Sequence, residues 1–192
     1  MAKKYEFKPD KPRSSWLSKL HLTVLQRKAI LKWGLFGLSL LVLSVLQDVI
    51  LCRFRFYGAT TELVPCAIIL ICVIMGTERG GVFVLISSAL YLFSGTAPGP
   101  YSMVFLTFWG LFVSILRQAF LQKGFFATML CTALAMVAYV LCNFIIGVFL
   151  GLAPFDRFFG ACITAGLSLI SAPILYPIFM SIGSIGGEAW KE

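Results

Sequence analysis

The chain has 192 residues, of which 59% are hydrophobic and only 12% are charged, and its mean hydropathy is +0.93. This composition excludes a single water-soluble domain and indicates an all-α integral membrane protein. The net charge of +8 is concentrated beside an apolar stretch, which favours an anionic lipid surface as the partner and argues against nucleic acid.

Residues 1–32 form a basic leader. Nine of the sixteen Lys and Arg residues precede Trp33, and they are Lys3, Lys4, Lys8, Lys11, Arg13, Lys19, Arg27, Lys28 and Lys32. The positive-inside rule retains such a segment in the cytoplasm. Residues 14–32 mix apolar and basic side chains, which predicts either an amphipathic helix in the membrane interface, anchored by Trp16, or an extension of the first transmembrane helix. Residues 1–13 are polar and basic, so we expect them to be disordered.

Residues 33–187 are predicted to form one transmembrane domain, followed by a cytoplasmic tail over 188–192. Charged residues and Gly/Pro-rich segments divide this domain into about six apolar spans, over 33–52, 60–76, 80–94, 101–116, 125–150 and 158–182. Residues 80–116 carry no charge but are too many for one helix, and the Gly and Pro residues at 94–100 break the run. The second span is short for a hydrocarbon core of about 30 Å, so it is expected to borrow residues or to sit in thinned bilayer. A re-entrant hairpin of the second and third spans, which would leave four full crossings, stays open.

The basic residues also indicate the orientation of the bundle. With the N-terminus inside, thirteen Lys and Arg residues are cytoplasmic, which are the nine of the leader together with Arg79, Arg117, Lys123 and Lys191. Three are outside, namely Arg53, Arg55 and Arg157. This asymmetry predicts an even number of crossings with both termini in the cytoplasm.

Asp48 is the only acid that this division places well inside a span, and Gln47 precedes it. An ionisable residue within a membrane span is a candidate for function. Asp48 also lies about one turn from the outer end of its span, where it could form a structural ion pair with Arg53 or Arg55.

Glu62, Glu78 and Arg79 lie at span ends, where they are expected to mark boundaries, although Glu78 and Arg79 could instead contact a cytoplasmic partner. The acids are scattered and the one histidine, His21, lies in the leader, so no pair suited to acid–base catalysis is predicted. No nucleophile-elbow, metalloprotease or phosphate-loop motif occurs in the sequence. We therefore expect the protein not to be an enzyme.

The six cysteines show no metal-binding spacing, so we expect neither a metal site nor a cofactor, and interpret them as small packing residues. They are Cys52, Cys66, Cys72, Cys131, Cys142 and Cys162. Small residues four positions apart allow transmembrane helices to pack closely, and such pairs are Gly110 with Ser114, Gly147 with Gly151, and Ala161 with Ala165. Whether one such face joins a second copy of the chain stays open.

Several short motifs carry a resemblance to a known family. The first span ends in Leu46-Gln47-Asp48-Val49-Ile50-Leu51, and a junction over 58–65 follows it. Gly76-Thr77-Glu78-Arg79-Gly80-Gly81 separates the next two spans, and the last span contains Ile174-Leu175-Tyr176-Pro177-Ile178. From about Trp33 to Ile185 this order is similar to MreD, the family of rod-shape-determining membrane proteins. Many members carry an acid at the end of the third helix, where this chain has Tyr91-Leu92-Phe93-Ser94-Gly95.

The resemblance implies a non-catalytic membrane scaffold of the bacterial cell-elongation machinery, located in the inner membrane. Such a protein binds a bitopic MreC-like partner and, through it, helps to couple MreB filaments to peptidoglycan synthases and so to maintain cell shape.

The alternative is the substrate-binding component of an energy-coupling-factor transporter for a vitamin or micronutrient, whose six-helix architecture the MreD bundle resembles. That function requires an outward polar cavity, which Asp48, Arg53, Arg55 and Glu62 could face. Such components also dock their coupling subunit through small residues of the first helix, and Gly34, Gly37 and Ser39 match that pattern only in part.

Overall fold

The computed structural model describes residues 24–54, 59–120 and 124–185. Within these ranges the chain forms six α-helices, α1 (Val24–Val49), α2 (Leu63–Met75), α3 (Thr77–Phe93), α4 (Pro100–Phe120), α5 (Phe125–Phe149) and α6 (Phe158–Gly183). Two short 3₁₀ turns, Leu51–Arg53 and Phe155–Arg157, follow α1 and precede α6. The described part of the chain contains no strand, and the fold is all-α as the composition predicts.

α1 is one continuous helix from Val24 through Trp33, so residues 24–32 extend the first apolar span rather than forming a separate helix. The expected disorder of residues 1–13, the N-terminal part of the interfacial helix and the cytoplasmic tail lie outside the described residues.

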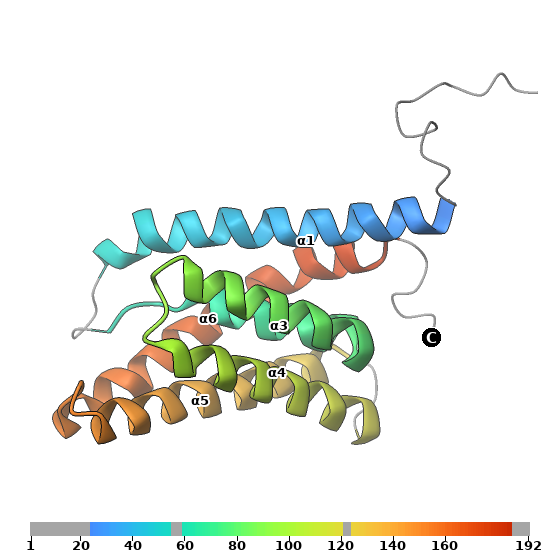
Figure 1. Cartoon of the computed structure of the whole chain (residues 1–192). Helices are drawn as coiled ribbons and strands as arrows, with labels where there is room; N and C mark the ends of the chain where they lie inside the picture. Colours follow the sequence, from blue (N-terminus) through green and yellow to red (C-terminus); the bar gives the residue numbers. More distant parts are fainter. Residues whose placement is uncertain (1–23, 55–58, 121–123, 186–192) are drawn as a thin grey trace, which may run out of the picture.

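Successive helices run in alternate directions, so their termini gather at two ends of the bundle (Figure 1). At one end α1, α3 and α5 finish and α2, α4 and α6 begin; we call it the Glu62 end, because Glu62 is the N-cap residue of α2. The opposite end is the Arg79 end, because Arg79 lies in the first turn of α3. Side chains that are far apart in sequence therefore meet at each end.

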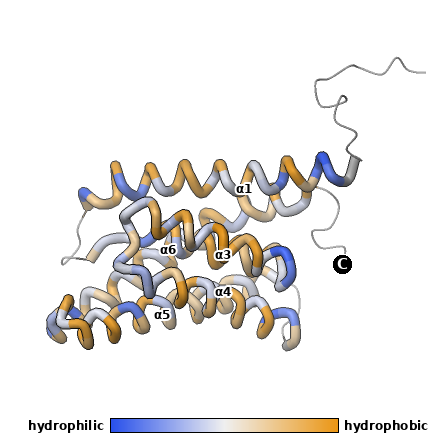
Figure 2. Tube along the Cα trace, viewed as in Figure 1, coloured by the Kyte–Doolittle hydropathy of each residue, from blue (hydrophilic) through white to orange (hydrophobic). Residues whose placement is uncertain are grey.

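Four segments are long and apolar enough to cross a membrane, namely Gln26–Arg53, Pro100–Ala119, Phe125–Phe149 and Phe155–Gly183. Hydrophobic residues occupy most of the length of the helices, and hydrophilic residues appear near both ends of α1 and at the start of α3 (Figure 2). These are the properties of an α-helical membrane protein. At 13 residues, α2 is shorter, about 20 Å at 1.5 Å per residue.

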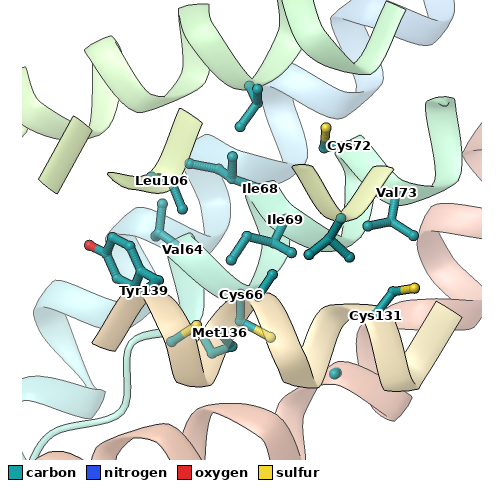
Figure 3. Packing of buried hydrophobic residues seen from close by; sticks show 14 of the residues in the cluster. Val64, Cys66, Ile68, Ile69, Cys72, Val73, Leu106, Cys131, Met136 and Tyr139 are labelled. Atoms are coloured by element: carbon teal, nitrogen blue, oxygen red, sulfur yellow. The ribbon is translucent and has the colours of Figure 1, made fainter. Parts of the chain in front are cut away.

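α2 is the central helix of the bundle and contacts each of the other five. Every side chain from Leu63 to Ile74 is buried. Figure 3 shows several of these side chains packed near Leu106 of α4 and Met136 of α5. Because other helices rather than lipid surround α2, its length does not have to match the hydrocarbon thickness. Enclosure on all sides also explains why α2 is apolar around its whole circumference.

The closest approach between helices is centred on Cys72 of α2. A Cβ atom at Gly80 of α3 would lie 2.5 Å from the Cys72 carbonyl oxygen, so only glycine fits this crossing. From α4, the Gly110 carbonyl accepts a hydrogen bond from the Cys72 thiol, and the Ser114 hydroxyl donates to the Cys72 carbonyl, each at 3.5 Å. The Gly110–Ser114 spacing therefore serves packing inside the bundle.

The Gly147–Gly151 pair does not form a packing face of this kind. Gly151 has φ of +69°, a left-handed conformation that glycine adopts without a steric penalty, and it lies just beyond the end of α5. The amide of Leu152 donates to the Gly147 carbonyl at 2.8 Å, which closes the end of the helix. Gly151 therefore terminates α5, and the predicted role of this pair in helix packing is wrong.

α1 packs against the bundle along one face, but few of its side chains are fully buried. Among its described side chains only Lys32, Phe36 and Gln47 are buried. The Lys32 ammonium donates a buried 2.8 Å hydrogen bond to the Gly183 carbonyl at the end of α6, and the Phe36 ring packs between aromatic rings of α3 and α6. The large apolar side chains that α1 exposes between Phe36 and its end are Leu38, Leu41, Val42, Val45, Leu46 and Val49.

Candidate functional site

Polar side chains from all six helices converge toward the Glu62 end. Gln47 comes from α1, Glu62 from the start of α2 and Tyr91 from α3. The others, which come from α4, α5 and α6, are Ser102, Tyr139, Asn143 and Ser168. We call these seven residues the polar cluster. All except Glu62, which is partly exposed, are classed as buried.

Two side chains of the polar cluster fix the first turn of α2. The Val64 amide donates a 2.8 Å hydrogen bond to Oε1 of Gln47, and the Glu62 amide donates a 2.9 Å bond to Oγ of Ser168. Amides at a helix start have no partner within their own helix, and burying them without one is costly. Gln47 of α1 and Ser168 of α6 therefore hold the start of α2 in place.

Three atoms of the polar cluster are buried and form no hydrogen bond of 3.5 Å or less among the described residues, although the Tyr139 hydroxyl lies within interaction range of Asn143. They are Oε2 of Glu62, Oη of Tyr139 and Oδ1 of Asn143. Tyr139 is fully buried and Asn143 is 9% exposed. The Asn143 amide nitrogen, by contrast, donates to the Tyr139 carbonyl at 3.0 Å. Most buried polar atoms in native proteins are paired, so three unpaired atoms in one region call for a physical account.

Glu62 lies close enough to Tyr91 and Tyr139 for its charge to act on both hydroxyl groups. The Tyr91 hydroxyl also lies within interaction range of Gln47 and of Tyr139, and the Tyr139 hydroxyl lies within range of Ser102 and Asn143. Figure 3 shows the Tyr139 ring beside Val64, with its hydroxyl directed away from the apolar side chains. One carboxyl group, two phenols and one amide oxygen are thus gathered in a mainly apolar interior.

The structure brings only some of the predicted site residues together. Gln47 and Glu62 meet in the polar cluster, whereas Asp48 is exposed. Arg53 is exposed as well. The ion pair considered between Asp48 and Arg53 is absent from the described residues. The other expected partner, Arg55, lies outside the described residues.

Glu78 and Arg79 are exposed in the first turn of α3, at the opposite end of the molecule from the polar cluster. A polar contact between α3 and α4 at that end joins the Thr77 hydroxyl, which donates at 2.6 Å, to Oε1 of Gln118. The structure therefore does not bring Glu78 and Arg79 together with Glu62.

Sequence reasoning missed both tyrosines of the polar cluster. Tyr139 and Asn143 are four residues apart, so they project from the same face of α5, and two polar residues at this spacing within an apolar helix are a usable signal. Tyr91 was noted only because it stands near a position where an acid was expected. Neither residue becomes informative until Glu62, which lies on another helix, is placed beside them.

Two cationic side chains bind carbonyl groups at the C-terminal ends of helices at the Arg79 end. Arg117 of α4 donates a hydrogen bond to the Val73 carbonyl in the last turn of α2, and Lys32 binds the end of α6. Positive groups at helix C-termini stabilise the exposed carbonyls and the helix dipole. These two buried cations therefore have a structural role at the end of the bundle remote from the polar cluster.

No group of three or more His, Cys, Asp and Glu side chains within the described ranges could hold a metal ion. All six cysteines are free thiols, of which Cys66, Cys72 and Cys131 are buried in helix interfaces. Comparison of the chain with protein-family models, curated proteins and solved structures found no match.

Proposed function

We propose that this protein is a non-catalytic scaffold of the bacterial cell-elongation machinery that binds an MreC-like bitopic protein in the inner membrane. In this proposal all six helices cross or enter the bilayer, α2 under the cover of the others, and both termini are cytoplasmic. The bound partner then links the bundle to MreB filaments and peptidoglycan synthases.

The observation that carries the proposal is the position of the residues that resemble MreD. Gln47, from the first motif, holds the start of α2. Gly80, from the second motif, permits the α2–α3 crossing at Cys72. Tyr176, from the last motif, packs edge-on against Phe125 of α5 with 4.9 Å between ring centroids. Each motif therefore contributes to a junction of the bundle, which is what a resemblance based on a shared architecture requires.

The distribution of charge supports the proposed orientation. Among the described residues the Arg79 end carries five cations, Arg27, Lys28, Lys32, Arg79 and Arg117, and one acid, Glu78, whereas the Glu62 end carries the acids Asp48, Glu62 and Asp156 beside Arg53 and Arg157. A positive excess at one end of a helical bundle places that end in the cytoplasm.

The exposed face of α1 is the surface on which we place the partner helix. Between Phe36 and Gln47 the side chains of Leu40 and Leu43 are half-buried against the bundle, whereas Leu41 and Val45 are 61% and 53% exposed. An added Cβ at Gly34 or Gly37 would meet no atom within 4 Å, so another backbone has room to approach. A single transmembrane helix, as a bitopic partner supplies, fits a face of this length and composition.

Site-specific photo-crosslinking in native membranes tests this proposal. A photoreactive residue at position 41 or 45 of α1 is expected to capture an MreC-like protein, whereas one at position 130 or 134, on exposed α5, is expected not to. Depletion of the protein should also produce rounded cells. Equal capture at both pairs of positions would refute the assigned face. Absence of an MreC-like protein from every adduct, combined with normal cell shape after depletion, would refute the function.

A second candidate function, the substrate-binding component of an energy-coupling-factor transporter, is favoured by one observation, the unpaired polar atoms at the Glu62 end. The two functions differ in their partners. Purification from native membrane with nucleotide-binding coupling subunits, together with release of a vitamin-like ligand on mild denaturation, would support the transporter instead of the scaffold.

A further inference from the structure

We propose that the lipid-facing seam between α1 and α3 binds one anionic phospholipid, with the headgroup phosphate at Arg79 and an acyl chain along the seam. The residues that define this α1–α3 seam are Ile30, Trp33 and Gly37 of α1, and Arg79, Phe83, Ile86 and Leu90 of α3. The inference goes beyond the scaffold function and does not depend on it, because it requires only that the bundle lies in a membrane.

Aromatic rings join α1 to α3 near the Arg79 end. The centroid of the Phe83 ring lies 5.7 Å from that of Trp33 and 5.8 Å from that of Phe36. Lys32, which directly precedes Trp33, is fixed at the end of α6 by its 2.8 Å bond to the Gly183 carbonyl. Both α1 and α3 begin at the Arg79 end and run toward the Glu62 end (Figure 1). Direct contacts therefore set the position of the start of α3 relative to α1.

The side of α3 that bears the Phe83 ring carries a cation at its start and apolar side chains along its length. Arg79 lies four residues before Phe83, so the two project from the same side of the helix. Ile86 and Leu90, three and seven residues after Phe83, share that side and are 48% and 64% exposed. Arg79 and Leu90 are eleven residues apart, about 16 Å at 1.5 Å per residue, close to half of a hydrocarbon core of about 30 Å. This side of α3 therefore has the length and polarity of one lipid leaflet.

The facing side of α1 is also uncovered. Ile30 and Gly37 lie three residues before and four residues after Trp33, so all three share one side of the helix. Ile30 is 59% exposed, and a Cβ atom added at Gly37 would meet no atom within 4 Å. The two helices are thus joined at the aromatic rings, while apolar surface beside the rings stays available to an acyl chain.

The charge at the head of the seam is complementary to an anion. Arg79 is exposed and belongs to the end of the bundle that carries five cations and one acid among the described residues. That acid, Glu78, is adjacent to Arg79 in sequence and therefore projects from a different side of α3. A guanidinium binds a phosphate through two parallel N–H bonds, and basic residues at a membrane surface attract anionic lipids. Hydrophobic residues follow the hydrophilic start of α3 directly (Figure 2), which favours an amphipathic anion over a soluble one.

Lipid titration of the full chain tests the proposal. The protein is purified in micelles that contain zwitterionic phosphatidylcholine, and phosphatidylglycerol replaces it stepwise at constant total lipid. Native mass spectrometry gives the number of phosphatidylglycerol molecules retained and the apparent affinity of the first, and the thermal unfolding midpoint reports its effect on stability. Glycerol 1-phosphate, which has the phosphate but no acyl chain, is the competitor that distinguishes a lipid site from a site for free phosphate.

Two variants report on the seam, and each has a matched control. Arg79→Gln removes the cation, and its control is Arg157→Gln, an exposed arginine at the Glu62 end. Leu90→Ser makes the apolar side of α3 more polar, and its control is Leu130→Ser on α5, where the leucine is exposed to a similar extent, 61% against 64%. All four side chains are exposed, so the variants are expected to fold, and circular dichroism verifies the helical content of each.

One phosphatidylglycerol should be retained about fivefold more tightly than phosphatidylcholine and should raise the unfolding midpoint. Arg79→Gln should abolish this preference, and Leu90→Ser should weaken phosphatidylglycerol binding by a smaller factor. The two control variants should bind as the wild type does. The proposal would be overturned by equal binding of the two lipids, by the same loss in Arg157→Gln as in Arg79→Gln, or by equal binding to Leu90→Ser and Leu130→Ser. Displacement of the lipid by glycerol 1-phosphate would overturn it as well, because the site would then recognise phosphate alone.

Discussion

The crossing of α2 and α3 at Gly80 provides the sharpest test of the packing in this bundle. Replacement of Gly80 by alanine places a Cβ atom 2.5 Å from the carbonyl oxygen of Cys72 and 3.2 Å from its carbonyl carbon. Both neighbours are backbone atoms, which cannot rotate away. Moving from 2.5 Å to the ordinary contact distance of 3.4 Å requires a shift of about 0.9 Å between the two helices.

The connection between these helices restricts such a shift, because Gly76 alone separates the end of α2 from the start of α3. Overpacking of a core of this kind costs about 1–3 kcal/mol, and the better helix propensity of alanine returns about 0.5–1 kcal/mol. Gly80→Ala should therefore lower the free energy of unfolding by up to about 2.5 kcal/mol.

The matched control is Gly37→Ala on the exposed face of α1, where an added Cβ meets no atom within 4 Å. This variant should be neutral or more stable by about 0.5 kcal/mol, because only the propensity term remains. Reversible unfolding in mixed micelles, followed by tryptophan fluorescence, measures both variants. A Gly80→Ala protein as stable as Gly37→Ala would show that the two helices do not cross as closely as described.

Three further outcomes are expected. Lys32→Met should lower stability by about 1.5–3 kcal/mol, measured by the same unfolding experiment, because the Gly183 carbonyl loses a charge-assisted hydrogen bond. Gln47→Leu should cost about 1–3 kcal/mol, because it leaves the buried Val64 amide without its acceptor; equal protection of that amide from hydrogen exchange in both proteins would contradict this. Deletion of residues 1–13 should leave insertion and orientation unchanged in a cysteine-accessibility assay, because Lys28 and Lys32 still flank the first span.

Much of the helical organisation can be predicted from the sequence, because charged residues and Gly/Pro-rich segments separate the apolar spans. α5 and α6 begin at Phe125 and Phe158, the residues at which the apolar spans begin. α1 behaves differently. Hydropathy places the start of its span at Trp33, whereas the helix is already formed at Val24, because basic residues lower hydropathy without breaking a helix.

The enclosure of α2 could not be predicted, because a hydropathy scale treats lipid and a protein interior as the same apolar solvent. The same limit applies to the polar cluster. Glu62 was identified as a polar residue at a span boundary, but its neighbours Tyr91 and Tyr139 come from helices that only the tertiary arrangement brings beside it. The sequence therefore identifies Glu62 as a single candidate residue, but it does not predict which side chains lie beside it.

The position of α2 connects the packing of the bundle with the polar cluster. Side chains from three helices hold it: Gln47 and Ser168 support its first turn, and Arg117 binds the Val73 carbonyl in its last turn. Glu62 immediately precedes this helix, and the bond from its amide to Ser168 fixes the backbone from which its side chain extends. An unpaired buried polar atom persists only where the surrounding structure determines its position. The burial of α2 and its two bonds to neighbouring helices therefore fix the point from which the Glu62 side chain enters the polar cluster.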